Sequence, residues 1–522
     1  MGSHRLLFCD KKDGLAMNSI DWSLSVGKLL RGTAVILLPS LLFLLLFQQM
    51  KAAPTAVHTI IAVNTTADEL NSDGDCSLRE AIQSANTNDK IDGCTFAGSG
   101  DLVVSVPAGS YFITLGSAGE DANAGGDFDL LASMTIQGTG VGSTVLDANL
   151  FDRLFDIDPA HSTSISVTIV GMTLQNGRPP LGSNGGGIRN FDDTLTVQES
   201  FISDGRLTGN STLLAHGGGI FSGGGFSAGL GVVHIISTTI EDNSSTFGSG
   251  GGIYNDGGLL NVSGSTIIGN SAQIISGTAS AGGIANTGGT TNILNSAILD
   301  NESDGQAGGI SNFFSFAVMN IANSTISGNR TDGSGGGIRN SGTLYLTNVT
   351  IINNTADLDA QFGGSGGGIR NQGILHLKGS IIFGNTDNLT VGDATDAIQR
   401  PDIYDTTTLV SEGYNMLGVI TGTTTITNGV NEDIVGIDPQ LGSRTGSPPY
   451  FPLSLVSPAL NRIPALHCTF VVTGTNPLFS HGQAILFDQA GQVRPDVSMQ
   501  RCDVGAVEPP YAFVLIPFVA TD

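Results

Sequence analysis

One phrase recurs seven times between residues 185 and 371: a cluster of small residues, an isoleucine, one variable residue and usually an asparagine. The isoleucines are Ile188, Ile220, Ile253, Ile284, Ile310, Ile338 and Ile369, and they lie 32, 33, 31, 26, 28 and 31 residues apart. A period of this length is typical of a stacked solenoid. A closed globule does not repeat itself in this way, so the repeat restricts the chain to an elongated fold.

The second half of each repeat alternates β-branched and aliphatic residues with small polar ones and ends in asparagine, as in residues 344–354. Period-two alternation over such short runs indicates brief strands joined by tight turns. We therefore predict an all-β fold, a single-stranded right-handed parallel β-helix, with a short N-terminal capping helix and a C-terminal cap. The right hand follows the crossover preference of parallel strands.

Stacking in register would align the seven isoleucines in one buried column, with neighbours about 4.8 Å apart. The terminal asparagines would form a second column at a turn, because Asn tolerates left-handed backbone and its amide can bond to the amides above and below. These residues are Asn243, Asn270, Asn301, Asn329, Asn354 and Asn385.

The N-terminus predicts a secretory leader over residues 1–53. Lys28 and Arg31 precede the apolar run 34–47, and small residues follow it. An uncleaved membrane anchor is the alternative, although the run is short for a span. Removal of the leader would change the formal net charge from −25 to −28, because residues 1–53 hold six basic and three acidic groups. Such an acidic rod repels phosphate backbones, which argues against nucleic acid as a partner.

Cysteine usage also indicates export. Cys9 lies in the leader, and an even number remains: Cys76, Cys94, Cys468 and Cys502. Three pairings are open, and sequence proximity favours Cys76 with Cys94 and Cys468 with Cys502. No C-x-x-C spacing accompanies these cysteines, so a metal site on them is disfavoured.

Residues 76–82 carry the sequence Cys-Ser-Leu-Arg-Glu-Ala-Ile, and this stretch resembles the CSLREA domain, which stands at the front of exported bacterial β-helix proteins. Residues 73–75 and 107–111 also resemble that family. The resemblance implies an N-terminal cap over residues 54–100. Independently, Leu78, Ala81, Ile82 and Ala85 share one face of a short helix, which suits a lid over the open first coil.

The C-terminal part resembles the choice-of-anchor Q domain at residues 413–418, 438–442, 457–460, 488–491, 494–495 and 502–508. That family usually has aspartate at the position of Asn461 and arginine at the position of Ala490. The repeats themselves are similar to those of polymorphic outer-membrane proteins, in the pectin-lyase-like group. We expect the parallel β-helix over 101–385 and its end with the cap over 386–508. Residues 509–522 are a short apolar tail, either a final strand or a sorting signal.

Strand alternation turns the residue after each core isoleucine outward. The resulting row is Arg189, Phe221, Tyr254, Ala285, Ser311, Arg339 and Arg370. Aromatic and guanidinium groups on a flat face suit sugar rings or another protein. The binding candidates are Arg189, Phe221, Tyr254, Arg339 and Arg370. The alternative is that these are scattered surface residues with no binding role.

Catalytic groups are sparse. A lyase needs an arginine or lysine base near calcium-binding acids, and a hydrolase needs paired carboxylates. The catalytic candidates are Arg189, Asp192 and Asp193, with His216 in a loop. The two aspartates lie where a hairpin turn is expected, which favours a solvated turn over a catalytic pair.

Calcium is the one cofactor that the sequence suggests, and none is expected to be required. Glu69, Asn71, Asp73, Asp75 and Glu80 occupy positions one, three, five, seven and twelve of a calcium-loop spacing. An acidic turn leading into the cap helix is the alternative.

These observations predict a secreted or cell-surface bacterial protein, a structural or adhesive rod that binds an extracellular glycan or a surface protein. We expect a monomer with membrane contact only through the leader or the tail. The competing hypothesis is a polysaccharide lyase or glycoside hydrolase of the pectin-lyase-like group.

Overall fold

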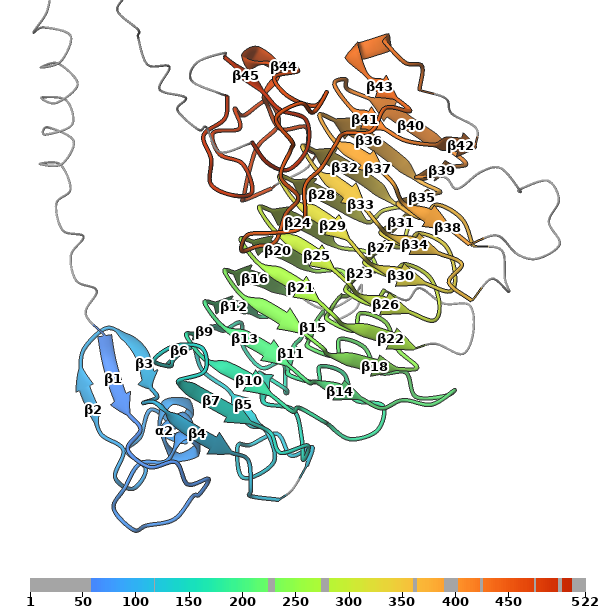
Figure 1. Ribbon diagram of the computed structural model, residues 1–522. Coiled ribbons are helices and arrows are strands. Elements are labelled where there is room, and N and C mark those ends of the chain that lie inside the picture. The colour runs from blue at the N-terminus through green and yellow to red at the C-terminus, as the bar shows by residue number, and fades with distance from the viewer. Residues whose placement is uncertain are drawn as a thin grey trace, which may run out of the picture. The chain divides into compact units, whose positions relative to one another are not determined.

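A computed structural model describes residues 58–508 apart from 117, 224–230, 274–280, 360–363, 389–401, 423–425, 474–475 and 496–499. The predicted leader (1–53) and apolar tail (509–522) lie outside the described residues. The chain is a right-handed parallel β-helix, as its repeat predicts (Figure 1). Among the described residues, no helix has the length and apolar character needed to cross a membrane.

The predicted isoleucine column lies in an 11-stranded parallel sheet. Register pairs join Ile188 to Ile220 and so on to Ile369, and all seven side chains are fully buried. The strands, in chain order, are β5 (Phe128–Leu130), β8 (Phe155–Ile157), β11 (Ile188–Asn190), β15 (Ile220–Ser222), β19 (Ile253–Asn255), β23 (Ile284–Asn286), β27 (Ile310–Asn312), β31 (Ile338–Asn340), β35 (Ile369–Asn371), β39 (Ile403–Asp405) and β42 (Ile420–Gly422).

A 13-stranded sheet follows the first sheet in each coil, and its inward residues alternate with outward ones, as Leu195 and Val197 show. Its strands are β2 (Phe96–Gly98), β1 (His58–Ala62), β3 (Asp101–Ser105), β6 (Met134–Gln137), β9 (Ser166–Val170), β12 (Thr194–Gln198), β16 (Val232–Ile236), β20 (Leu259–Ser263), β24 (Thr290–Leu294), β28 (Val318–Ala322), β32 (Thr343–Thr347), β36 (Ile374–Lys378) and β40 (Thr408–Ser411).

Two further sheets complete the coils. The 12-stranded sheet comprises β4 (Gly109–Phe112), β7 (Thr144–Asp147), β10 (Thr173–Gln175), β13 (Phe201–Ser203), β17 (Thr239–Glu241), β21 (Thr266–Ile268), β25 (Ala297–Leu299), β29 (Thr325–Ser327), β33 (Thr350–Ile352), β37 (Ile381–Phe383), β41 (Met416–Leu417) and β43 (Ile434–Val435). The 7-stranded sheet comprises β14 (Arg206–Leu207), β18 (Ser244–Thr246), β22 (Ser271–Gln273), β26 (Glu302–Ser303), β30 (Arg330–Thr331), β34 (Thr355–Ala356) and β38 (Thr386–Asp387).

The predicted asparagine column is a continuous hydrogen-bonded ladder. From Asn243 to Asn385, each Nδ2 donates to Oδ1 of the next asparagine at 2.9–3.0 Å. The ladder ends where Asn385 Nδ2 donates to Asp402 Oδ1 at 2.8 Å. A carboxylate accepts hydrogen bonds but has no N–H to donate. Asp402 therefore ends the ladder without leaving a buried donor unpaired.

A second ladder, which the sequence analysis did not predict, uses the asparagines of the Ile-x-Asn phrase. It links Asn255, Asn286, Asn312, Asn340 and Asn371 through Nδ2 to Oδ1 bonds of 2.8–2.9 Å and ends on Asp405 at 2.7 Å. All six side chains are fully buried. From Asn255 to Asn371, each coil therefore has two buried amide contacts that require its neighbour to lie in one register.

Glycine at the corner three residues before most of the isoleucines has a steric cause. Gly366 has a φ of +73°, and a Cβ there would lie 2.3 Å from the carbonyl oxygen of Ile369. Glycine accepts the left-handed backbone and the close approach without strain. Alanine takes the same corner before Ile284 and Ile310, as Ala281 and as Ala307 with a φ of +68°.

The N-terminal cap is the helix α2 (Leu78–Thr87) packed beside β1, β3 and β5. Ser77 and Glu80 form a capping box at its start, and the predicted face of Leu78, Ala81, Ile82 and Ala85 is buried. The Cys76–Cys94 disulfide, which the sequence favoured, links the helix start to the loop after it.

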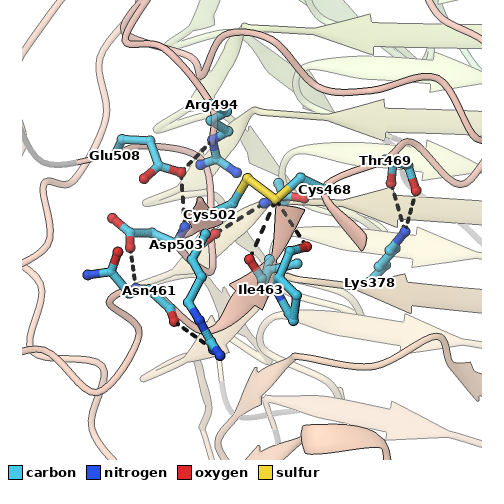
Figure 2. Close-up of a disulfide and its surroundings, with 12 residues drawn as sticks. Lys378, Asn461, Ile463, Cys468, Thr469, Arg494, Cys502, Asp503 and Glu508 are labelled. Atoms are coloured by element: carbon cyan, nitrogen blue, oxygen red, sulfur yellow. Dashed lines mark hydrogen bonds and ion pairs between the residues drawn. A yellow bond between two sulfur atoms is a disulfide. The ribbon is translucent and has the colours of Figure 1, made fainter. Parts of the chain in front are cut away.

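The C-terminal cap lies against the side of the later coils (Figure 1). It holds the short helix η2 (Ala465–His467) and the antiparallel pair β44 (Ile463–Pro464) and β45 (Arg501–Cys502). The short helix η1 (Val430–Glu432) lies between β42 and β43, at the end of the rod. The predicted Cys468–Cys502 disulfide joins η2 to β45 (Figure 2).

Polar contacts hold this cap to the rod. Lys378 Nζ donates to the backbone oxygen of Thr469 at 2.9 Å and to its Oγ1 at 2.8 Å, and Asn323 Nδ2 donates to the backbone oxygen of Phe487 at 2.7 Å. Within the cap, Arg494 Nε lies 3.1 Å from Glu508 Oε1, and Figure 2 shows this buried pair beside the disulfide. These rod contacts come from the 13-stranded sheet and the turn that follows it, on a different side from the isoleucine column.

Candidate functional site

The outward row predicted from the sequence exists as a register line on the 11-stranded sheet. Arg189, Phe221, Tyr254, Ala285, Ser311, Arg339 and Arg370 are successive backbone partners on β11 to β35. Their accessibility differs, however. Phe221 is only 3% exposed, and Ala285 and Ser311 are fully buried. The prediction that the row as a whole faces solvent is therefore wrong for its middle part.

The loop that ends at His216, just before the glycine cluster of the Phe221 coil, covers Tyr254, and Ala285 packs against Ala281, Ala307 and Tyr254. His216 stacks on Tyr254 with ring centroids 4.3 Å apart, and Tyr254 stacks on Phe221 at 5.7 Å. Burial raises the pKa of Tyr254 to about 12 and lowers that of His216 to about 4. Alternation sets the direction of a side chain out of its strand, but a long loop from the neighbouring coil can still fold over it.

Arg339 and Arg370 lie side by side further along the row, on the adjacent strands β31 and β35. The Arg370 guanidinium lies 4.1 Å from the ring centroid of Tyr404, and that of Arg339 lies 5.6 Å from Phe313. Arg339 Nη2 donates to Gln372 Oε1 at 2.9 Å. Burial and the charge of Arg370 lower the pKa of Arg339.

The two guanidinium groups have spare donors. Arg339 Nη1 and Arg370 Nε are buried and make no hydrogen bond. Among the described residues, neither arginine forms an ion pair with a carboxylate, which is unusual in a chain with a formal net charge of −25. Two neighbouring cations with unfilled donors favour an anionic ligand.

Exposed aromatic rings continue this surface on the turn after β27. Phe313 and Phe314 are 4.8 Å apart, and Phe314 stacks on Phe316 with centroids 5.4 Å apart and the planes 9° from parallel. Phe314 is 38% exposed and Phe316 is 57% exposed. We call the continuous set the arginine–aromatic strip; it comprises Phe313, Phe314, Phe316, Arg339, Arg370 and Tyr404.

Four residues of the strip were missed from the sequence. Phe313, Phe314 and Phe316 form an aromatic run in a chain with only 6% aromatic residues, and that run was the available signal. Tyr404 could have been found by extending the repeat one coil, since Ile403-Tyr404-Asp405 follows the Ile-x-Asn pattern with aspartate as its last residue.

The three catalytic candidates have separate partners. Arg189 forms two hydrogen bonds to the buried Asp156, with Nε at 2.8 Å from Oδ1. Asp192 pairs with His161 at 3.1 Å, and Asp193 Oδ1 accepts from the backbone N–H of Ile165 at 2.7 Å. Burial raises the pKa of Asp193 to about 6. These contacts hold turns and neighbouring coils together.

The predicted calcium loop brings part of its residues together. One carboxylate oxygen each of Glu69, Asp73 and Asp75 lie within 4.8 Å of one another, and Asp75 forms a similar group with Glu80 and Asp92. Asn71 Nδ2 donates to Glu69 at 2.8 Å. Glu80 accepts the backbone N–H groups of Ser77 and Asn71, both at 3.0 Å, so its carboxylate caps the helix and is not bidentate toward the loop centre.

No family model matches the sequence, and no curated protein matches it. Among solved structures, the chain is similar to pectate lyase Pel9A, with 14% identity, a TM-score of 0.34, and coverage of 87% of this chain and 97% of that one. It is also similar to the A-module of the mannuronan C-5 epimerase AlgE4 of Azotobacter vinelandii, with 15% identity, a TM-score of 0.29, and coverage of 70% and 92%. Neither match assigns a substrate or a residue role to this chain.

Proposed function

We propose that the protein is an exported rod, at the cell surface or secreted, that binds an acidic glycan through the arginine–aromatic strip. The observation that carries the proposal is the pair Arg339 and Arg370, adjacent on the sheet, with buried donors unfilled and no carboxylate partner among the described residues.

The aromatic neighbours favour a sugar over a bare anion. Phe314 and Phe316 present stacked, exposed rings, and Tyr404 lies under the Arg370 guanidinium. An aromatic face packs well on the apolar face of a sugar ring, and arginine binds carboxylate or sulfate through paired N–H groups. Strands about 4.8 Å apart repeat these groups at a regular interval, which suits a polymer.

Export and surface placement rest on the sequence. The apolar run 34–47 resembles a secretory leader, and the cap and tail resemble CSLREA and choice-of-anchor Q domains. Two disulfides close the two caps, and disulfides persist in oxidising compartments. In this proposal the rod acts as a monomer and does not bind nucleic acid. It contacts a membrane only through its leader or tail.

Isothermal titration with oligogalacturonate, alginate and sulfated oligosaccharides tests the proposal. We expect saturable binding of at least one acidic glycan, and weaker binding of its methyl ester where the glycan carries carboxylates. Arg370→Gln should weaken binding about tenfold or more, since a hydrogen bond to a charged group contributes about 1.5–3 kcal/mol. Phe316→Ala should weaken it about threefold to tenfold through lost stacking.

Arg206→Gln is the matched control, because Arg206 is 57% exposed on β14, in a different sheet. It removes the same charge and should leave glycan binding unchanged. Equal binding of the acid and its ester, an equal loss in Arg206→Gln, or no binding across the panel would reject the proposal. If the protein binds a surface protein and none of the glycans, the ligand of the strip is that protein and not a glycan.

One observation favours a second candidate, a polysaccharide lyase. Arg189 lies against two acids, hydrogen-bonded to Asp156 and 3.8 Å from Asp121, as a lyase with an arginine base beside calcium-binding acids would require. Arg189 donates to Asp156 through Nε and Nη2, so it would have to leave that pair and lose a proton before it could act as a base. Release of unsaturated oligosaccharides from a polyuronate, lost in Arg189→Ala, would establish this activity over simple binding.

A further inference from the structure

A group of carboxylates near the N-terminal cap lies outside the strip and outside the predicted calcium loop. Asp129 on β5 and Asp156 on β8 are register partners, and they continue the outward row below Arg189. Asp121 reaches the same place from the loop between β4 and β5. One carboxylate oxygen from each of the three lies within 4.8 Å of the others.

The two sheet carboxylates are enclosed. Asp129 and Asp156 are fully buried. Asp129 Oδ2 accepts the backbone N–H of Asn123 at 2.7 Å, but its Oδ1 is buried without any hydrogen-bond partner. A buried acceptor of this kind requires a donor or a cation.

The basic residues nearby reach Asp156 and Asp121 but not Asp129. Arg153 Nη1 lies 2.7 Å from Asp127 and 2.8 Å from Asp156, while Arg189 pairs with Asp156 and lies 3.8 Å from Asp121. Among the described residues, Asp129 is in no ion pair.

We propose that Asp121, Asp129 and Asp156 bind a calcium ion that ties the loop between β4 and β5 to the first coils of the rod. All three ligands are carboxylate oxygens, with neither sulfur nor nitrogen among them, which suits a hard cation. The side chain of Asp121 is 59% exposed, so the ion has a path from solvent and room for water ligands.

The location gives the ion a structural role. The loop already depends on charged groups: Glu120 accepts the backbone N–H of Gly125 at 2.8 Å, Asp152 accepts that of Gly119 at 2.8 Å, and Arg79 of α2 donates to the backbone oxygen of Gly126 at 2.8 Å. A cation would join this loop directly to β5 and β8. The first coils have no preceding rung, so such a cross-link strengthens the end of the rod that stacking alone supports least.

The test uses the mature full-length chain, stripped with EDTA and titrated with calcium chloride while the melting temperature and the heat of binding are followed. We expect saturable binding with a dissociation constant of about 0.1–1 mM, typical of extracellular sites, and a rise in melting temperature. Magnesium should raise it less, because it holds its water and demands stricter geometry.

Asp129→Asn keeps the side-chain shape and removes the charge, so it should abolish this binding event and most of the rise in melting temperature. Asp121→Asn should weaken calcium binding about tenfold while leaving the melting temperature of the metal-free protein unchanged, since its side chain is largely exposed. This second variant keeps the test valid if Asp129→Asn does not fold.

Asp73→Asn is the matched control in the separate acidic loop, and it should retain the calcium response. The proposal is overturned if wild type shows no calcium-dependent rise, if magnesium acts equally well, if both Asp121→Asn and Asp129→Asn respond like wild type, or if Asp73→Asn alone abolishes the response. Glycan binding through Arg370 is a separate readout, so the two proposals fail independently.

Discussion

At the residue scale, the ladder asparagines carry more than one contact each. Asn301 Oδ1 accepts both the backbone N–H and Nδ2 of Asn270 at 3.0 Å, while its own Nδ2 donates to Asn329 at 2.9 Å. Asn301→Ala would leave the buried backbone N–H of Asn270 unpaired, whereas Asn270 Nδ2 keeps its bonds to the backbone oxygens of Ile240 and Ile268. At about 1–3 kcal/mol for one unsatisfied buried group, we expect a loss of about 1–3 kcal/mol in the free energy of unfolding. Denaturant unfolding measures it.

Asn388→Ala is the control at this scale, because Asn388 is exposed and its side-chain hydrogen bond to the backbone oxygen of Leu358 is long at 3.4 Å. It should change the free energy of unfolding by about 0.5 kcal/mol or less. Similar losses in both variants would show that the ladder amides contribute no more than a surface side chain.

At the element scale, the loop over the middle of the outward row depends on a neutral histidine. His216 Nδ1 accepts the backbone N–H of Ser249 at 3.0 Å, and burial lowers its pKa from 6.5 to about 4. The unfolded chain therefore takes up the proton first, so this contribution to stability is complete above about pH 6.5 and is lost as the pH falls toward 4. We expect the melting temperature of wild type to fall more steeply across this window than that of His216→Gln.

His481→Gln is the comparison for this pH series, since His481 is exposed. The melting temperature of His481→Gln should depend on pH as steeply as that of wild type. Because both variants keep all the titrating carboxylates, the difference between them reports His216 alone. A slope in His216→Gln equal to that of wild type would contradict the prediction.

At the scale of the whole molecule, coils contact mainly their neighbours, so the rod should tolerate the loss of one complete rung. Deletion of Tyr254 to Ile284 removes one 31-residue period and joins Ile253 to Ala285 in the same register. We expect a folded protein, shorter by about 4.8 Å, with the C-terminal cap still on its coils. Circular dichroism and small-angle scattering check these outcomes.

Deletion of residues 254–269, about half of a period, is the control. It displaces every later strand onto the wrong sheet and should abolish cooperative melting. If both deletions unfold, the rungs are not interchangeable and the nearest-neighbour description of the rod is wrong.

Much of the fold could be predicted because the determinants repeat in the sequence. Each isoleucine must meet the one in the next coil, and each ladder asparagine must reach its neighbour, so a constant period is enough to place Ile310 or Asn329 in its column. The cap helix was predictable for a local reason, since Ser77, Glu80 and the apolar spacing from Leu78 lie within one short segment.

The sites were less predictable, because access depends on what other coils contribute. Phe221 and Arg370 occupy the same position in the repeat, yet Phe221 is covered and Arg370 lies in the strip. Asp121, Asp129 and Asp156 come from two coils and a loop, so no spacing in the chain reveals their group. The sequence alone determined the period, the columns and the direction of each side chain, through local alternation. Only the tertiary structure decided which of those side chains remain open and which charges meet, because loops of unequal length fold across the regular coils.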